Sequence, residues 1–228
     1  GELEKLHYLK NSEDISKDIV SKLKNHETFR KLFTNFLNEI GYNKGGTFWD
    51  RFVVRVAPAE NNLPYREASR INIHRDTWGT NLYQQINWWA PVSNVEEKNT
   101  MIFYPDYFDV PVKNTTSTWD LNIYLANRKK GDFSYPSAPQ LKEDLPSNIN
   151  KIPVTIKPGE ILCFSGAHLH SSSKEKSENT RISFEIRTIC ENDLNFSAQA
   201  PNVDCDLQWK FPKIFKKIND NSPLKITS

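Results

Sequence analysis

Cysteine is scarce in this chain of 228 residues, and its three copies are Cys163, Cys190 and Cys205. The count is odd and no two of them form a Cys-x-x-Cys pair. A disulfide framework is therefore not indicated, and a reducing compartment is favoured. Cys163 lies within the apolar run at 161–164, and this position predicts a small buried side chain.

The chain also lacks a long apolar run and a strong charge of either sign. No stretch of about 18 apolar residues occurs and no charged-then-apolar leader opens the sequence, so we expect a cytoplasmic protein without a membrane partner. Thirty basic and 28 acidic residues give a net charge of +2, which does not indicate binding to nucleic acid. The sequence does not indicate an oligomeric state.

Aromatic residues, in contrast, make up 12% of the chain, and hydrophobic residues make up 37%. This composition predicts a packed globular protein with a lined cavity rather than a disordered chain. The length fits a single domain. Within it we expect a helical cover at 1–46, a β core at 47–190 and a C-terminal tail at 191–228.

Hydrophobic spacing divides the chain into helices followed by strands. Apolar residues recur at three-to-four spacing in the N-terminal part and stop at Gly41, which predicts helix. From Thr47 the period becomes two, as in strands. This order predicts a mainly β fold, a double-stranded β-helix (jelly roll, cupin-like) with the N-terminal helices packed on its outside. The expected strands are 48–56, 69–76, 82–89, 100–104, 151–156, 160–164 and 180–189, with helical pieces at 117–130 and near 211–218.

One face of three expected strands is unusually polar. His74 and Asp76 share a face of one strand, and Gln85 and Asn87 share a face of the next. The last strand carries Arg, Ser, Glu and Arg opposite three apolar residues. A solvent-facing side is the ordinary alternative for each strand alone. The presence of these residue types, instead of the usual Lys, Glu and Thr, favours a polar-lined barrel interior that holds a metal and an anionic ligand.

The tripeptide His74-Arg75-Asp76 places an imidazole and a carboxylate two residues apart, so both can reach one ion if the segment is a strand. A second histidine would complete two imidazoles and one carboxylate. On Fe(II) this ligand set leaves adjacent positions open for a 2-oxo acid and dioxygen. His168 and His170 both follow the strand 160–164, and local spacing leaves both open as the third ligand.

Arg181-Ile182-Ser183 forms an R-x-S motif on the polar face of the last expected strand. Arginine presents a planar fork that matches a carboxylate, and serine adds a hydroxyl donor. The alternative is that Arg181 pairs with Glu178 or Glu185, because a buried arginine without an anion is costly.

In this order the motifs resemble those of the Fe(II)/2-oxoglutarate-dependent oxygenases, and in particular their phytanoyl-CoA dioxygenase-like branch. The segment 157–164, Lys-Pro-Gly-Glu-Ile-Leu-Cys-Phe, followed by Leu-His-Ser-Ser at 169–172, looks like that branch's turn, strand and distal iron ligand. The stretch 99–105 is similar to a further segment of the branch, although Thr100 stands where glycine is usual. The resemblance covers 69–189.

The resemblance implies an Fe(2+) ion bound by His74, Asp76 and His170, with 2-oxoglutarate as cosubstrate and O2 as oxidant. Arg181 lies eleven residues after His170 and thirteen after His168, and the shorter interval is the one that fits the family. The resemblance further implies cosubstrate-binding residues, namely Arg181, Ser183, Gln85 and Asn87, and substrate-pocket residues, namely Trp78, Trp89 and His168.

The activity that the resemblance implies is hydroxylation of a small metabolite, with decarboxylation of 2-oxoglutarate to succinate and CO2. Asp76 favours hydroxylation over halogenation, because the related halogenases have glycine or alanine at this position. A cupin-type isomerase or epimerase and a non-catalytic jelly-roll binding module are the alternatives. The string His74-Arg75-Asp76 followed by Asn81 also matches a protein-kinase catalytic loop, but the sequence has no glycine-rich loop before it and no Asp-Phe-Gly after it.

Overall fold

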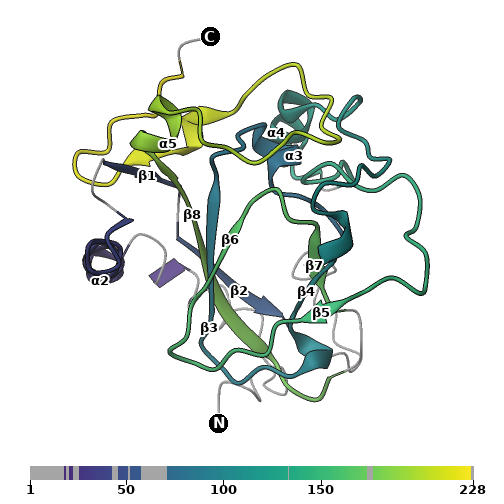
Figure 1. Ribbon diagram of the computed structural model, residues 1–228, viewed down its shortest axis with the longest axis horizontal. Coiled ribbons are helices and arrows are strands. Elements are labelled where there is room, and N and C mark those ends of the chain that lie inside the picture. Colours follow the sequence, from purple (N-terminus) through teal and green to yellow (C-terminus); the bar gives the residue numbers. More distant parts are fainter. Residues whose placement is uncertain are drawn as a thin grey trace.

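The computed structural model describes most of the chain from residue 26 onward, and this part is mainly antiparallel β-sheet with a few short helices (Figure 1). None of the helices in this part is both long and apolar enough to span a membrane. Most of the predicted helix before residue 26 lies outside the described residues. The first two residues of the predicted strand 69–76 lie outside them as well. The structure describes residues 18, 21–22, 26–42, 46–50, 52–57, 71–132, 134–173 and 177–226.

Two antiparallel sheets are found in the described residues. The larger has the order β6-β3-β8-β1-β9, with β2 also paired to β8, and the smaller has the order β5-β4-β7. The larger sheet consists of β1 (Thr47–Trp49), β2 (Val53–Ala57), β3 (Ile86–Pro91), β6 (Leu162–Ser165), β8 (Arg181–Cys190) and β9 (Lys216–Lys217). The smaller sheet consists of β4 (Met101–Phe103), β5 (Ile152–Pro153) and β7 (His170–Ser172).

Short helices connect and cover these sheets. The predicted helix at 117–130 is found as α4, and the predicted helical piece near 211–218 is a short 3-10 helix followed by β9. The α-helices are α2 (Glu27–Glu39), α3 (Thr77–Thr80), α4 (Leu121–Lys129) and α5 (Glu191–Asn195), and the 3-10 helices are η4 (Glu97–Asn99), η5 (Pro105–Tyr107) and η6 (Pro212–Ile214).

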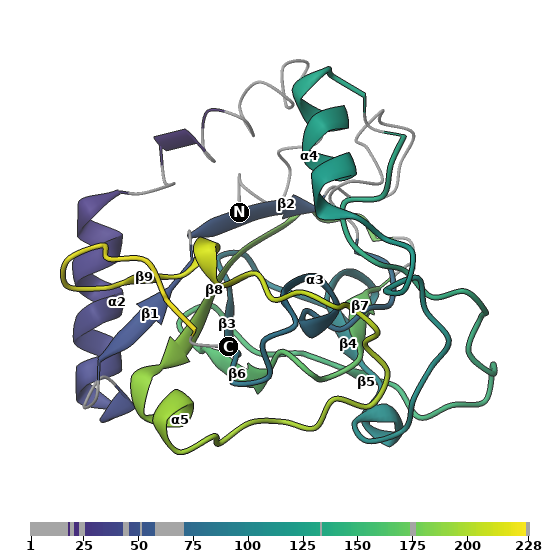
Figure 2. The same cartoon turned by 90° about the horizontal axis from the view of Figure 1, so that it is seen from above.

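Helix α2 packs on the outside of the larger sheet, as the sequence predicted. Its first turn is capped by the ring of His26, and the chain turns away just after the helix at Gly41, which has a φ of +76°. Figure 2 shows α2 beside β1 and β9, on the opposite side of the molecule from the smaller sheet. The contact between helix and sheet is a buried apolar cluster that includes Phe33, Leu37, Trp88 and Ile186.

The predicted strand 48–56 is divided into β1 and β2, because regular strand pairing is interrupted at Asp50. The Asp50 carboxylate accepts hydrogen bonds from the backbone N–H of Arg187 (3.0 Å) and from its guanidinium Nε (2.6 Å). Strand β1 pairs with residues 188–190 of β8, and β2 pairs with residues 181–185. The side chain of Asp50 therefore interrupts the pairing of one continuous strand at the level of Arg187.

The prediction of a strand that runs through Asp76 was wrong. Among residues 71–76, His74 alone forms a β-bridge, with His170. Asp76 has a helical backbone (φ −65°, ψ −28°) and directly precedes α3. Trp78 in that helix is almost fully buried, and its Nε1 donates to Asp204 Oδ1 at 2.7 Å. Burial of this large ring against the C-terminal tail overrides the local alternation.

The prediction that Cys163 is buried was also wrong, because its side chain is exposed. Strand β6 is the edge strand of the larger sheet. Alternation along β6 places Phe164 in the cavity between the sheets and Cys163 on the opposite face, in register with Trp88. Cys163 remains exposed there because it lies at the edge of the sheet.

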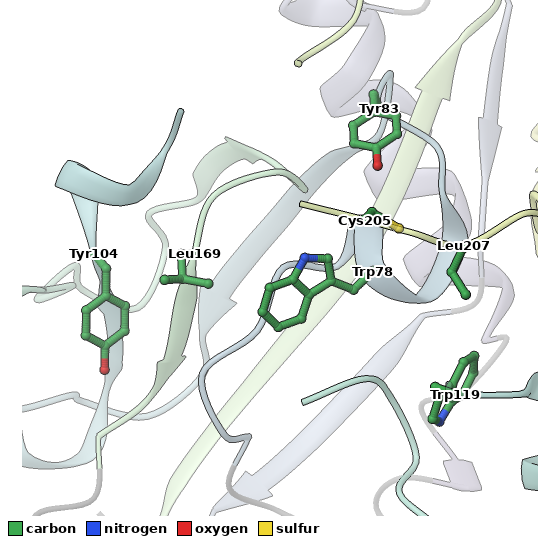
Figure 3. Packing of buried hydrophobic residues seen from close by; sticks show 7 residues of the cluster. All are labelled: Trp78, Tyr83, Tyr104, Trp119, Leu169, Cys205 and Leu207. Carbon is green, nitrogen blue, oxygen red and sulfur yellow. The ribbon is translucent and has the colours of Figure 1, made fainter. Parts of the chain in front are cut away.

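The C-terminal tail contributes to the core as well as to the surface. Figure 3 shows Cys205 and Leu207 of the tail beside Trp78. All three are buried in one apolar cluster together with Leu169, which directly precedes β7. The tail therefore packs against the two segments that hold His74, Asp76 and His170.

Candidate metal centre

His74, Asp76 and His170 converge where the segment before α3 meets β7. The backbones of the two histidines bond in both directions, at 2.9 and 3.0 Å. Their ring centroids are 4.3 Å apart. One potential ligand atom from each of the three residues lies within 4.8 Å of the others. The structure thus brings together the three residues that the sequence predicted as metal ligands, even though Asp76 is not on a strand.

Backbone carbonyls orient both imidazole rings. His74 Nδ1 lies 2.8 Å from the carbonyl oxygen of Asn72, and His170 Nδ1 lies 2.9 Å from that of His168. Because a carbonyl can only accept, each Nδ1 carries a proton, so Nε2 is the ring nitrogen left to bind a metal. His74 Nε2 lies 3.2 Å from Asp76 Oδ1. At this distance, His74 Nε2 and Asp76 Oδ1 can share either a proton or a cation.

The protonation states of the cluster also favour a cation. Burial, together with the nearby charge of His74, lowers the pKa of His170 to about 4. Burial alone would raise the pKa of Asp76, but the hydrogen bond to His74 and the charges of His74, His170 and Arg187 hold it well below the usual range. At neutral pH, His170 therefore offers a lone pair and Asp76 offers a carboxylate, as a divalent metal requires.

These three residues lie on the wall of a cavity between the two sheets, with an empty volume of about 480 Å³ that includes space open to solvent. Arg181, the predicted cosubstrate arginine, also lines this cavity. The cavity is lined by Arg55, Ile71, His74, Asp76, Asn87, Trp89, Met101, Phe164, His170, Ser171, Ser172, Arg181, Glu185 and Arg187.

The R-x-S motif begins β8, and both of its polar side chains are buried. The Arg181 guanidinium carbon lies 5.9 Å from the centre of the Trp89 ring. Ser183 Oγ is buried and has no hydrogen-bond partner among the described residues. Glu185, one of the two alternative partners considered for Arg181, pairs with Arg55 instead, because both of its oxygens accept from that guanidinium at 2.6 and 2.9 Å.

A second arginine of β8 reaches the cavity near Asp76. Arg187 pairs with Asn87 in the register of β3 and β8, and Asn87 donates to Asp76. The guanidinium of Arg187 is held by Asp50 Oδ2 through Nε (2.6 Å) and Nη2 (2.5 Å). Sequence reasoning placed Arg187 on the polar face of the strand but missed its partner, which is 137 positions away in the chain.

The predicted substrate-pocket residues are distributed differently. Trp89 lines the cavity, whereas Trp78 lies in the apolar core. His168 does not line the cavity: its Nδ1 lies 3.1 Å from the carbonyl oxygen of Ser165, and its ring packs on Phe108 with centroids 4.5 Å apart. The backbone carbonyl of His168, rather than its ring, contacts the histidine cluster.

Sequence reasoning missed the role of Arg75, the middle residue of His74-Arg75-Asp76. Its guanidinium is buried and forms an ion pair with Asp204 at 3.1 Å. Its other nitrogens donate to backbone carbonyls of the loop after β4 and of the segment before β7. This network ties the tail and two loops to the segment that carries His74 and Asp76. No local pattern signals it, because each partner is at least 32 positions away in the sequence.

Comparison with known proteins gives structural similarity alone. No family model and no curated protein match the sequence. Among solved structures, the chain is similar to the epimerase SnoN in complex with Fe3+, α-ketoglutarate and nogalamycin RO, with a TM-score of 0.50 and 15% identity over 90% of this chain and 73% of SnoN. The non-haem monooxygenase ThoJ has a TM-score of 0.45 and 13% identity over 68% of this chain. EvdO2 from Micromonospora carbonacea var. aurantiaca has a TM-score of 0.45 and 9% identity over 71% of this chain and 64% of EvdO2.

At this identity, the similarity to SnoN shows a shared fold and no more. The chain is also shorter than several of the proteins it matches. It spans 51% of ThoJ and 29% of EvdMO1, another solved structure that it matches.

Proposed function

We propose that this protein is a mononuclear non-haem Fe(II) oxygenase that uses 2-oxoglutarate and O2, built on a double-stranded β-helix of the phytanoyl-CoA dioxygenase-like type. It would hydroxylate a small metabolite and convert 2-oxoglutarate to succinate and CO2. The observation that carries the proposal is the convergence of His74, Asp76 and His170 on a cavity that Arg181 also lines.

The donor set fits ferrous iron. Two imidazole Nε2 atoms and one carboxylate oxygen would occupy one face of an octahedral ion, and three adjacent positions would stay open. Iron bound here would supply the activation of O2, coupled to oxidation of 2-oxoglutarate. The protein's part is to hold His74 and His170 in the tautomer that presents Nε2 and to keep Asp76 ionised.

Arg181 and Ser183 would bind the distal carboxylate of 2-oxoglutarate. A buried hydroxyl without a partner costs about 1–3 kcal/mol, and a carboxylate that accepted from Ser183 Oγ would remove this cost. The planar guanidinium of Arg181 matches a carboxylate, and the ring of Trp89 holds it from one side. The complex of SnoN, which contains iron and α-ketoglutarate on a similar fold, supports 2-oxoglutarate as the cosubstrate.

The substrate is proposed to be a small molecule with both apolar and polar surface. Ile71, Met101 and Phe164 give the cavity an apolar part, and the Arg55–Glu185 ion pair gives it a polar part. The net charge of +2 does not indicate binding to nucleic acid. The cytoplasmic location stays a prediction.

Succinate release tests the proposal. Anaerobically purified protein, loaded with Fe(2+) and given 2-oxoglutarate, O2 and a panel of small metabolites, should form succinate together with one oxygenated metabolite. The Asp76→Ala variant should form none, because it lacks one of the three ligands. An isomerase or epimerase would return a metabolite of unchanged mass, and a binding module would release no succinate in any mixture.

A further inference from the structure

Three polar side chains form a hydrogen-bonded chain that ends on Asp76. Thr80 Oγ1 donates to Gln85 Oε1 at 3.1 Å, and Gln85 Nε2 donates to Asn87 Oδ1 at 2.9 Å. Asn87 Nδ2 then donates to Asp76 Oδ2. Thr80 belongs to α3, Asn87 to β3, and Gln85 to the segment directly before β3. These hydrogen bonds thus link α3 to β3 and reach the candidate metal centre through buried side chains.

The direction of every bond in this chain is determined by its end. A carboxylate can only accept, so Asn87 must direct its NH2 group at Asp76 and its carbonyl oxygen at Gln85. Gln85 must then direct its NH2 group at Asn87 and its carbonyl oxygen at the Thr80 hydroxyl. Amide orientation is ordinarily assigned from the bonding network, and here one orientation satisfies all three links.

Burial and close packing hold this hydrogen-bonded relay of Thr80, Gln85 and Asn87 in place. Gln85 is 0% exposed, and Thr80 and Asn87 are also buried. A Cβ atom on Gly166 would lie 2.7 Å from Gln85 Nε2, so the absence of a side chain at Gly166 lets its backbone pack against the amide. The Gly166 N–H also donates to the backbone carbonyl oxygen of Gln85 at 3.0 Å. Buried polar side chains held in this way have few alternative positions.

We infer that Gln85 and Asn87 are positioning residues that make Asp76 a one-oxygen metal ligand. Asn87 occupies Asp76 Oδ2, whereas Asp76 Oδ1 lies on the side of His74 Nε2, at 3.2 Å. A carboxylate that bound through both oxygens would take a further position on the metal. By holding Oδ2, the relay keeps three adjacent positions open, as a bidentate cosubstrate and O2 require. The inference rests on the proposed function for the identity of the metal.

This role differs from the one that the family resemblance implied for the same two residues, which was contact with 2-oxoglutarate. Gln85 is not among the residues that line the cavity. Its side-chain NH2 group donates to Asn87, and its side-chain carbonyl oxygen accepts from Thr80. Asn87 does line the cavity, but its NH2 group is directed at Asp76.

Mn(2+) binding tests the inference without turnover. The number of water molecules on protein-bound Mn(2+) can be measured by electron–nuclear double resonance in 17O-labelled water, and the affinity can be measured by titration. An octahedral ion with three single-atom ligands should carry three waters in the parent protein. Asn87→Ala frees Asp76 Oδ2, so the ion should lose one water and the Kd should rise by about 10- to 100-fold.

Two further variants separate positioning from folding. Gln85→Glu keeps the shape of the side chain but removes the donor to Asn87, and it should change the water count in the same direction as Asn87→Ala. Gln84→Ala is the matched control, because Gln84 also donates one amide bond, to Gln199 at 2.9 Å, but at an exposed site away from Asp76. Gln84→Ala should keep the parental water count and Kd.

Two waters on Mn(2+) in the parent protein, or three waters and an unchanged Kd in both Asn87→Ala and Gln85→Glu, would overturn the inference. Absence of Mn(2+) binding by the parent protein would overturn it as well. Parental binding with the expected loss of one water in the variants, but without succinate release in the metabolite assay, would contradict the proposed function alone.

Discussion

Replacement of Asp204 by alanine should destabilise the protein strongly, although Asp204 lies in the C-terminal tail. Its carboxylate is 4% exposed and is the ion-pair partner of Arg75, which is 2% exposed. Asp204→Ala leaves the Arg75 guanidinium with its backbone acceptors but without this anion. Removal of one partner from a buried ion pair costs about 3–5 kcal/mol.

Two other donors also lose their acceptor in this variant. Trp78 Nε1 donates to Asp204 at 2.7 Å, and the Val112 N–H donates at 3.1 Å. Each loss costs about 1–3 kcal/mol if no water replaces the carboxylate, and the terms do not simply add. We therefore expect a loss of at least about 3 kcal/mol, and a smaller loss for Asp204→Asn, which keeps one carbonyl acceptor.

Urea unfolding of the metal-free protein measures this loss. Lys113→Ala is the control, because Lys113 forms an exposed ion pair with Glu143 and should change the free energy of unfolding little. Asp204→Ala should also weaken Mn(2+) binding, since Arg75 lies between His74 and Asp76 in the chain. A loss of less than about 1 kcal/mol, within the range of an exposed pair, would refute the claim that the tail supports the metal centre.

Three further predictions follow from the site. Arg181→Ala should raise the 2-oxoglutarate concentration needed for half-maximal succinate formation by about 10- to 100-fold, because charged hydrogen bonds contribute about 1.5–3 kcal/mol; an unchanged requirement would remove Arg181 from the cosubstrate site. The pKa of His170 in the folded protein, about 4, is below that of an unfolded histidine, so the free energy of unfolding of the metal-free protein should fall as the pH drops from about 6.5 towards 4. Urea unfolding at several pH values should show a weaker pH dependence for His170→Gln than for the parent protein. An identical pH dependence in the two proteins would argue against a buried neutral imidazole. Gly166→Ala should displace Gln85 and raise the Mn(2+) Kd by about 10-fold or more, whereas Gly79→Ala, where an added Cβ meets no atom within 4 Å, should not; equal effects would contradict the relay.

The face to which each side chain points could be predicted from the sequence for strands that pair with a neighbour on both sides. Strand β8 lies between β3 and β2 or β1, and its residues Arg181, Glu185 and Arg187 line the cavity, as the period of two predicted. In β3, Asn87 and Trp89 also face the cavity. A strand held by two neighbours cannot rotate without losing both sets of backbone bonds, so its local pattern is reliable.

Alternation failed where tertiary contacts decide the backbone. The residues around Asp76 form a turn because Trp78 is buried against the tail, and the sequence before this turn resembles a strand. The segment nevertheless brings Asp76 to the two histidines. The family resemblance, through its interval to the cosubstrate arginine, implied His170 rather than His168 as the third ligand, and His170 is the histidine that joins the cluster.

The supporting network could not be predicted, because its partners are distant in the sequence. Asp204 and Arg75 are 129 positions apart, and Arg187 and Asp50 are 137 positions apart. Each of these side chains is an ordinary charged residue in its local context. The ion pair of Arg75 with Asp204 depends on the packing of the tail, and that of Arg187 with Asp50 depends on the interruption between β1 and β2. Neither feature is encoded in a local sequence pattern.

The central claim is that the cavity binds ferrous iron and 2-oxoglutarate together, and anaerobic visible spectroscopy tests it most directly. Addition of 2-oxoglutarate to the Fe(2+)-loaded protein should produce a weak metal-to-ligand charge-transfer band, which should be absent in Asp76→Ala and should need more 2-oxoglutarate in Arg181→Ala. Iron-loaded parent protein that gave no such band at saturating 2-oxoglutarate would contradict the claim.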